Sequence, residues 1–221
     1  MKPTKIPRIK ICCIQSIEEA RKAIAFGASA VGLVSKMPSG PGVISEQLIA
    51  GIAAKVPPGV TSVLLTSLQS RLPVIKQHQK CRTNAIQLVD RLNYGTLKEL
   101  KDAMAGVDII QVIHVAEKES IDEAVSVTPF VDGILLDSGN QLLPVKELGG
   151  TGRTHDWSIS RKIRDRVDVP VFLAGGLNPR NVAEAIKQVQ PFSVDVCSGV
   201  RTDGKLDEVK LRNFVNEVNS V

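Results

Sequence analysis

Short apolar runs alternate with amphipathic segments along the whole 221-residue chain, and no other feature restricts the fold as strongly. The eight runs span residues 9–14, 30–35, 61–67, 84–89, 108–115, 132–138, 169–176 and 193–199. They are almost continuously hydrophobic, as strands of a parallel sheet are when both faces are covered. The sequence therefore predicts eight parallel strands separated by helices.

The segments between these runs have helical periodicity and recognisable ends. Residues 16–27 begin with a capping box at Ser16 and Glu19, and residues 44–56 begin with a serine cap and stop before Pro57. The other predicted helices are 68–80, 96–104, 119–127, 155–167, 178–189 and 206–218. The first of these is the weakest, because a proline interrupts it.

Eight strand–helix units predict an α/β fold, a (β/α)8 or TIM barrel, as a single domain over residues 1–221. That fold typically needs about 250 residues, so the loops here must be short. A doubly wound Rossmann sheet is the alternative, but it carries GxGxxG after its first strand, where this chain has CCIQSIEEA. No linker, charge block or low-complexity stretch divides the chain, so one domain is expected.

The composition excludes several classes of protein. Lys and Arg number 28 against 23 Asp and Glu, and the signs are interspersed, which suits an anionic substrate better than nucleic acid. No apolar run reaches the roughly 18 residues of a membrane span, and the N-terminus lacks a signal-peptide pattern. The four cysteines lack zinc-type CxxC spacing, and a chain of this length needs no disulfide framework. We expect a reduced, soluble, cytoplasmic protein, monomeric or homodimeric, that binds neither nucleic acid nor membranes.

Three glycine-rich stretches, 149–152, 174–176 and 197–199, follow the last three predicted strands. Glycines let backbone N–H groups converge on an anion, and barrels commonly bind phosphate after strands 7 and 8. One such stretch would be explained by a tight corner alone, whereas three together favour a phosphorylated ligand. The predicted phosphate-binding residues are Gly150, Thr151, Gly152, Gly175, Gly176, Ser198 and Gly199.

Cys12 ends the first strand and Asp137 ends the sixth, on opposite sides of the barrel mouth. A thiolate beside Lys10, with a lowered pKa, is suited to act as a base. A carboxyl group whose pKa is raised by burial is suited to act as an acid. Alternatively, Cys12 packs in the core and Asp137 caps a helix. Strand alternation places Lys10 and Cys12 on one face and turns Cys13 to the other, under a helix.

For other residues near the predicted strand ends, we expect structural or substrate-binding roles and no catalytic role. Cys197 is expected to pack beside the phosphate loop, and Cys81 to lie in a polar loop. His155 is expected to be a helix-start or loop residue, and Trp157 to pack the sixth helix onto the barrel. Further predicted substrate-binding residues are Lys10, Lys36, Gln87 and Asp195.

Across about the whole chain, five motifs resemble those of the phosphoribosylanthranilate isomerase family. They are KICC (10–13), LLD (135–137), GGTG with DW (149–152 and 156–157), LAGGLNPRNV (173–182) and VDVCSGVR (194–201). The resemblance implies a (β/α)8 barrel that catalyses an Amadori rearrangement in tryptophan biosynthesis, without a metal or organic cofactor. It also implies that Asp137 protonates the furanose ring oxygen and that Cys12 removes the C2′ proton.

The chain departs from the family pattern around the expected aglycone site. The family's SPR, whose arginine is implied to pair with the anthranilate carboxylate, appears as SGPG (39–42), and QLHG appears as QLVD (87–90). Cys13 stands where glycine is usual and Arg201 where glutamate is usual. Lys36 and Arg153 are alternative partners for the carboxylate.

These departures leave three functions open. The first is isomerisation of the anthranilate derivative, and the second is a related isomerase or lyase reaction on another phosphorylated sugar. The third is binding of a phosphorylated ligand without catalysis. Retention of both Cys12 and Asp137 argues against the third.

Overall fold

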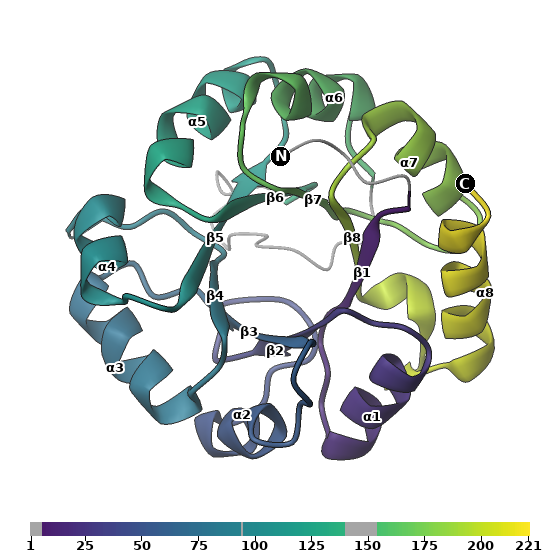
Figure 1. Ribbon diagram of the computed structural model, residues 1–221, viewed down its shortest axis with the longest axis horizontal. Coiled ribbons are helices and arrows are strands. Elements are labelled where there is room, and N and C mark those ends of the chain that lie inside the picture. The colour runs from purple at the N-terminus through teal and green to yellow at the C-terminus, as the bar shows by residue number, and fades with distance from the viewer. Residues whose placement is uncertain (1–5, 94, 140–153) are drawn as a thin grey trace.

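The protein forms a closed barrel of eight parallel strands, arranged in chain order from β1 to β8 with helices around the outside (Figure 1). The computed structural model describes residues 6–93, 95–139 and 154–221. Strand β1 pairs with both β2 and β8, which closes the sheet. The predicted (β/α)8 barrel is therefore confirmed.

The strands and helices fall close to the predicted segments. The strands are β1 (Arg8–Ile11), β2 (Ala30–Val34), β3 (Thr61–Thr66), β4 (Ala85–Leu88), β5 (Asp108–His114), β6 (Gly133–Asp137), β7 (Val171–Leu173) and β8 (Ser193–Val196). The helices are α1 (Ile17–Ala25), α2 (Glu46–Ala53), α3 (Arg71–Cys81), α4 (Leu97–Ala103), α5 (Glu119–Val127), α6 (Trp157–Arg166), α7 (Val182–Val189) and α8 (Glu208–Asn219). Two 3₁₀ turns, η1 (Thr128–Phe130) and η2 (Ser198–Val200), and a hairpin, β9 (Arg201–Thr202) and β10 (Lys205–Leu206), complete the described part.

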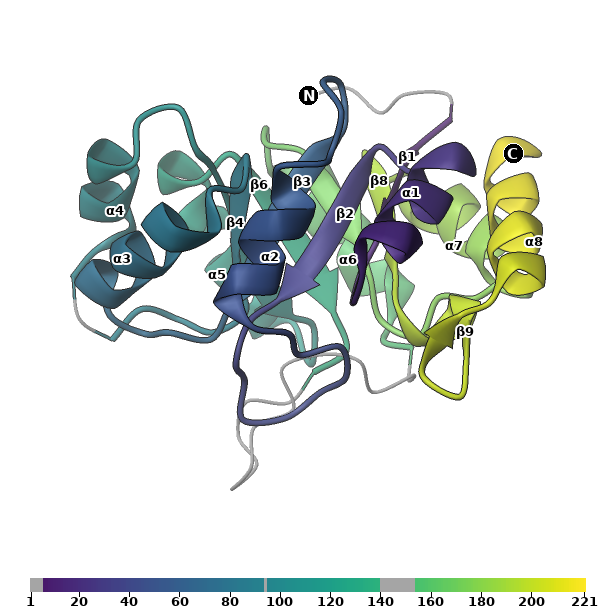
Figure 2. The ribbon, with the colours of Figure 1, turned by 90° about the horizontal axis from the view of Figure 1, so that it is seen from below.

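The strands are buried on both faces, which explains why they read as continuous apolar runs. Strands β2 and β6 have no exposed residue. One apolar cluster lies between barrel and helices and includes Ile11, Leu33 and Phe214, while a smaller one includes Val63 and Val112. In the described part of the chain, no helix combines the length and apolarity needed to cross a membrane. Figure 2 shows the strand arrows running toward one edge, where the loop after β2 and the β9–β10 hairpin project.

The predicted capping box of α1 is only half formed. Ser16 Oγ accepts a hydrogen bond from the Glu19 amide at 3.1 Å, as expected. The Glu19 carboxylate, however, accepts from the Gln15 amide at 3.0 Å, one residue before the cap. Ser45 caps α2 as predicted, accepting from the Leu48 amide at 3.2 Å.

Two predictions about α3 are wrong. Pro73 does not interrupt the helix, because it is the third of eleven residues and lies in the first turn. An N–H there has no partner within the helix, so proline costs nothing in hydrogen bonding. Cys81 is not in a polar loop: it is the last residue of α3 and is completely buried.

Candidate active site

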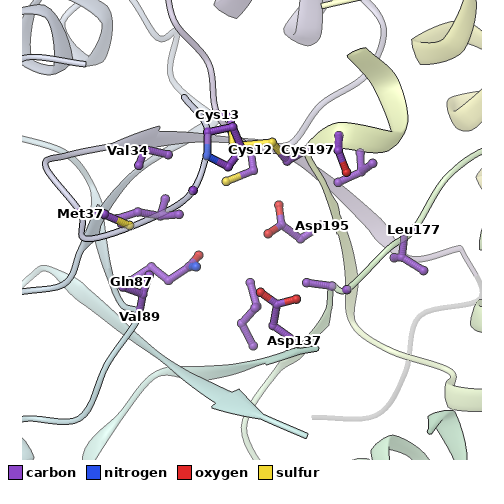
Figure 3. Close-up of a pocket in the computed structure, with 18 of the residues that line it drawn as sticks. Cys12, Cys13, Val34, Met37, Gln87, Val89, Asp137, Leu177, Asp195 and Cys197 are labelled. Atoms are coloured by element: carbon purple, nitrogen blue, oxygen red, sulfur yellow. A yellow bond between two sulfur atoms is a disulfide. The ribbon is translucent and has the colours of Figure 1, made fainter. Parts of the chain in front are cut away.

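A pocket of about 70 Å³ lies at the C-terminal mouth of the barrel, where Cys12, Asp137 and Asp195 meet (Figure 3). Cys12 follows β1, while Asp137 ends β6 and Asp195 lies in β8. The predicted site residues that line this pocket are Cys12, Gln87, Asp137, Gly175, Gly176, Asp195 and Ser198. The closed barrel thus brings together residues that are up to 186 positions apart in sequence, since residues 12 and 198 both line it.

Lys10 lies beneath the pocket as a completely buried cation. Its Nζ is 3.0 Å from Asp195 Oδ1, because β1 and β8 pair with Lys10 opposite Asp195. Burial lowers the pKa of Lys10, but Asp195 and Cys12 outweigh it and raise the pKa above its usual value. The ammonium group therefore stays charged beside the Cys12 thiol, as the shared strand face of Lys10 and Cys12 predicts.

Gly32, in β2, makes room for this pair. A Cβ at Gly32 would lie 2.8 Å from Cys12 Sγ and 3.2 Å from Lys10 Nζ. Any other residue here would push the thiol or the ammonium group away. The sequence analysis missed this position, although a glycine inside a strand often marks a close approach of other groups.

The thiol of Cys12 is protonated at neutral pH, contrary to the prediction of a lowered pKa. Burial raises its pKa to about 11, and the attraction of Lys10 only partly offsets this effect. The negative charges of Asp195 and Asp137 also raise it. Burial in the barrel, which no local sequence pattern reports, decides the direction. Lys10 is the charged side chain that favours the thiolate form of Cys12.

Asp137 has the raised pKa predicted for an acid. Burial is the largest cause, and it exceeds the opposing effects of the Ser138 amide and of His114. The Ser138 amide donates to Asp137 Oδ1 at 2.7 Å, which fixes the carboxyl group at the strand end. His114 lies opposite Asp137 in the β5–β6 ladder.

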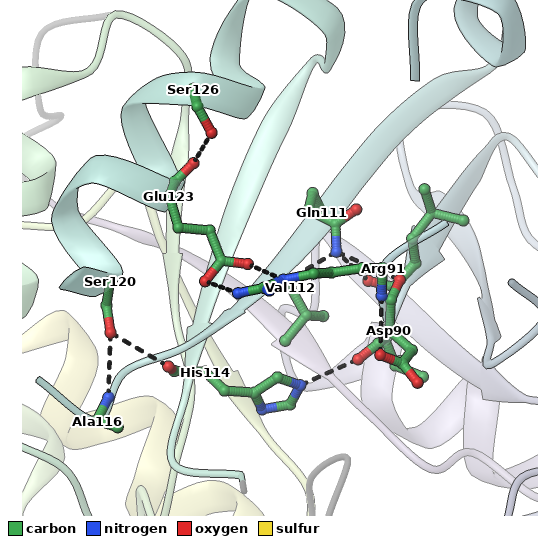
Figure 4. A network of polar contacts seen from close by, with 11 residues as sticks. Asp90, Arg91, Gln111, Val112, His114, Ala116, Ser120, Glu123 and Ser126 are labelled. Atoms are coloured by element: carbon green, nitrogen blue, oxygen red, sulfur yellow. Dashed lines mark hydrogen bonds and ion pairs between the residues drawn. The ribbon is translucent and has the colours of Figure 1, made fainter. Parts of the chain in front are cut away.

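A polar network braces the neighbouring ends of β4 and β5 (Figure 4). His114 Nε2 lies 3.0 Å from the Val89 carbonyl oxygen, and Asp90 Oδ1 accepts from the Arg91 amide at 2.9 Å. Arg91 forms an ion pair with Glu123 at 2.6 Å. The charge introduced at Asp90 thus lies outside the pocket lining, while Val89 places an apolar side chain on the wall.

Of the glycines predicted to bind phosphate, the described ones are required by backbone conformation or by close packing. Gly175 and Gly176 have φ of 81° and 61°, values that favour glycine. A Cβ at Gly175 would lie 2.9 Å from His155 Nδ1, and one at Gly199 would overlap the Leu177 carbonyl oxygen. Close packing is therefore one reason why glycine occupies these positions. The loops that contain them also line the pocket. Gly150, Thr151, Gly152 and Arg153 lie outside the described residues.

Three further predicted residues stand apart from the pocket lining. Lys36 is exposed and is not among the residues that line the pocket. His155 precedes α6 and its Nε2 lies 2.7 Å from Ser160 Oγ; burial lowers its pKa to about 4, so it is neutral at pH 7. Trp157 packs against the core, as predicted.

Cys13 and Cys197 form a disulfide, which overturns the prediction that all four cysteines are reduced. Cys13 was expected under a helix, and Cys197 only to pack beside the phosphate loop. The extended backbone ends at Cys13, however, because this residue has a φ of 61°, and Cys13 lines the pocket. Both sulfur-bearing residues line the wall next to Cys12.

Arg201 is a second feature that the sequence analysis left without a role. Its guanidinium donates to Glu19 Oε1 and Oε2 at 3.1 and 2.9 Å and to the Cys13 carbonyl oxygen. Glu19 in turn accepts from the amides of Gln15 and Leu206. The arginine thus joins the loop after β1 to the hairpin after β8.

Comparison with known proteins agrees with this geometry. A family model described as N-(5'phosphoribosyl)anthranilate (PRA) isomerase matches residues 9–217. The N-(5'-phosphoribosyl)anthranilate isomerase of Methanosarcina acetivorans is 36% identical over 96% of this chain and 92% of its own length, and that of Methanocella arvoryzae is 37% identical over 96% and 97%. The crystal structure of phosphoribosyl anthranilate isomerase from Thermotoga maritima is 32% identical, with a TM-score of 0.80 over 98% of this chain and all of that one. A further such structure, in complex with reduced 1-(o-carboxyphenylamino)-1-deoxyribulose 5-phosphate, is 30% identical with a TM-score of 0.78 and the same coverage.

Proposed function

The chain belongs to the N-(5'-phosphoribosyl)anthranilate isomerase family, and we propose that it converts that substrate to 1-(o-carboxyphenylamino)-1-deoxyribulose 5-phosphate in tryptophan biosynthesis. The observation that carries the proposal is a buried thiol and a buried carboxyl group, Cys12 and Asp137, on the wall of one pocket. The reaction is an internal aldose–ketose rearrangement, so it moves protons and needs no redox partner.

Asp137 acts first, as the general acid. Because its pKa is raised by burial, it holds a proton at a higher pH than an exposed aspartate does. It gives that proton to the furanose ring oxygen, the ring opens, and the C1′–nitrogen bond becomes a Schiff base. The Ser138 amide then stabilises the carboxylate that remains.

Cys12 acts second, as the base. Its thiolate removes the proton from C2′, giving an enolamine that tautomerises to the ketone. Lys10 supports this step, because its buried ammonium group favours the thiolate over the thiol. Asp195 holds Lys10 in place through their 3.0 Å ion pair. Each proton transfer by such a placed group is worth about 10²–10⁴-fold in rate.

The phosphate group of the substrate supplies binding energy away from the reacting carbons. We assign it to the loops after β7 and β8, with backbone amides around Gly176, Ser198 and Gly199 as donors. Anchoring a remote group fixes C1′ and C2′ between acid and base, which lowers the entropic cost of reaction. Gly150, Thr151 and Gly152 complete this site in our proposal.

The aglycone lies against an apolar wall in this proposal. Met37, Leu65 and Val89 line the pocket on the side of β2 to β4, together with Gly40 and Pro41 of the loop that lacks the family's arginine. An aromatic ring packs well on such a surface. Lys36 or Arg153 remains our prediction for the partner of its carboxylate. A phosphorylated small molecule is thus the partner, and the chain remains predicted as monomer or homodimer.

An assay of the purified chain on N-(5'-phosphoribosyl)anthranilate tests the proposal. We expect formation of the aminoketose by the wild-type chain, and complementation of a tryptophan auxotroph that lacks this isomerase. Cys81→Ala is the matched control, since it removes a buried thiol outside the pocket. If the folded wild-type chain neither turns over the substrate nor complements, the assignment is wrong.

A further inference from the structure

Cys13 joins the loop after β1 to two other parts of the barrel mouth. Its sulfur is bonded to Cys197, after β8. Its carbonyl oxygen accepts from the Arg201 guanidinium. Gly42, after β2, packs so close that a Cβ there would lie 2.5 Å from the Cys13 Cβ. Because Cys12 directly precedes Cys13, these contacts bear on the position of the proposed base.

Cys197 connects the same bond to the proposed phosphate loop. It immediately precedes Ser198 and Gly199, and its carbonyl oxygen accepts from the Val200 amide at 3.3 Å. Gly199 packs directly on the Leu177 backbone, in the loop after β7. The bond spans 184 residues, so a single covalent link joins the loop of the base to the loops proposed to hold phosphate.

We propose that Cys13 and Cys197 are positioning residues for the isomerisation, and that their disulfide is a reversible brace between the base and the phosphate loop. The inference rests on the proposed function for its catalytic part. Without the bond, Cys12 keeps its backbone hydrogen bond to the Val196 carbonyl oxygen at 2.8 Å, and Arg201 keeps its hold on the loop. The phosphate loop, however, loses its covalent tie. A less preorganised loop binds phosphate more weakly.

The brace is open to reduction from the pocket. Cys197 is half-buried and lines the wall, whereas the two free thiols, Cys12 and Cys81, are buried. A dithiol reductant attacks the bond through a mixed disulfide. It closes to a cyclic disulfide, giving up two electrons and two protons, and leaves Cys13 and Cys197 as thiols.

The experiment compares the full chain before and after treatment with dithiothreitol. Thiol titration after denaturation is expected to rise from two groups to four. The Kd for inorganic phosphate and the KM for the phosphoribosyl substrate are expected to rise about threefold or more on reduction, with a smaller change in kcat. Cys197→Ser and Cys13→Ser should show the reduced values at all times and no response to dithiothreitol. Cys81→Ala should respond as the wild type does.

Each outcome decides the brace separately from the isomerase activity. Four thiols before reduction, or an unchanged Kd and KM while the count rises from two to four, overturns the brace. A lower Tm with unchanged Kd and KM also overturns it, because the bond is then only structural. If neither form isomerises the substrate but the phosphate Kd responds, the brace stands and the proposed function fails. If the enzyme is active but its Kd and KM do not change on reduction, the proposed function stands and the brace is overturned.

Discussion

The two ends of the barrel both contain cavities, but only one is equipped for chemistry. The N-terminal end has the larger, at about 360 Å³ against about 70 Å³ at the mouth. Two of its charged residues already have partners: Asp132 pairs with Lys101 and accepts from the Ile109 amide, and Arg8 lies over the Phe192 ring at 5.2 Å.

The mouth is different, because its ionisable groups are buried. Lys10 is completely buried, and Asp137 and Asp195 are each 8% exposed. Charges removed from water are costly and change pKa values, so they mark a functional site more reliably than the size of a void does. Burial of titratable groups, and not cavity volume, therefore distinguishes the candidate active end of the barrel from the opposite end.

The largest expected effect comes from removing the proposed acid or base. Cys12→Ala and Asp137→Asn should each lower kcat by about 10²–10⁴-fold, because each removes one proton transfer. Asp108→Asn, at the opposite end of the barrel, should leave kcat unchanged. Steady-state kinetics on the three variants measures this. Equal losses at both ends would remove the distinction between them.

A smaller loss of kcat is expected when Lys10, the buried cation beside Cys12, is removed. We compare Lys10→Met/Asp195→Asn with the wild type, so that neither member of the buried ion pair is left without its partner. The attraction of Lys10 outweighs the repulsion of Asp195 in setting the pKa of Cys12, so the effect of losing Lys10 dominates. Without the ammonium group the pKa of Cys12 rises further above 11. The thiolate fraction then falls, and kcat at neutral pH drops about tenfold for each unit of pKa.

The pH–rate profile provides the check on that variant. In the wild type, activity should rise with pH up to the pKa of Asp137 and then level off, as the acid loses the proton while the base gains its charge. It should fall again only above the Cys12 pKa of about 11. Loss of Lys10 should lower the level region and move the alkaline fall to higher pH. An unchanged profile would contradict the role of Lys10.

Substitutions of Gly32 and Gly51 form a matched pair that tests whether the space beside the Cys12 thiol is needed for activity. Gly32→Ala places a methyl group 2.8 Å from Cys12 Sγ, so kcat should fall about tenfold through misplacement of the base. Gly51→Ala, in α2, has open space around its Cβ and should stabilise the protein by about 0.5–1 kcal/mol with kcat unchanged. Kinetics and chemical denaturation of both variants test this. A fully active Gly32→Ala enzyme would show that the thiol has room to move.

The smallest effects concern stability, and their signs should differ between the two ends. At the mouth, burial tends to raise the pKa of Glu19, but Arg201 and two backbone amides lower it below the usual 4.5. The lowered pKa contributes stability above about pH 4.5 that is lost as pH falls further. Glu19→Gln should therefore cost about 1–3 kcal/mol at pH 7, because it leaves the buried Arg201 guanidinium without its carboxylate partner.

At the N-terminal end of the barrel, the expected change in the free energy of unfolding has the opposite sign. Burial and the nearby Asp132 raise the pKa of Asp108, so its charge costs stability once pH rises through the usual value of 3.8. Asp108→Asn should raise the free energy of unfolding at pH 7 by a few tenths of a kcal/mol, because the side chain is largely solvated. Urea denaturation of both variants at pH 7 and pH 4 measures the contrast. If Glu19→Gln and Asp108→Asn change the free energy of unfolding at pH 7 in the same direction, the predicted contrast between the two ends is wrong.

Much of the fold was predictable because it depends on local patterns. The eight apolar runs fixed the number and order of strands, and polar helix starts such as Ser16 and Ser45 did cap α1 and α2. The errors arose where position within an element mattered. Pro73 predicts an interruption when only the sequence is considered, because the residues do not show where the first turn of α3 begins.

The sequence predicts which residues line the candidate site, but it does not predict their pKa values. Strand ends of a parallel barrel meet at one mouth, so Cys12 and Asp137 were expected to face one pocket, and they do. Besides Lys10 in β1, the pKa of Cys12 depends on how completely the barrel excludes water and on the negative charges of Asp137 in β6 and Asp195 in β8. Neither quantity can be read from the residues around position 12.

The barrel, the strand on which each candidate catalytic residue lies and the glycine turns after the strands all follow from the residues alone. These follow from periodicities of two and 3.6 residues, which act over a few neighbours. Three features depend instead on long-range contacts: the Cys13–Cys197 disulfide, the Arg201–Glu19 ion pair and the raised pKa of the Cys12 thiol. Closing β1 onto β8 brings residues about 185 positions apart into contact, and such distances leave no local pattern in a single sequence.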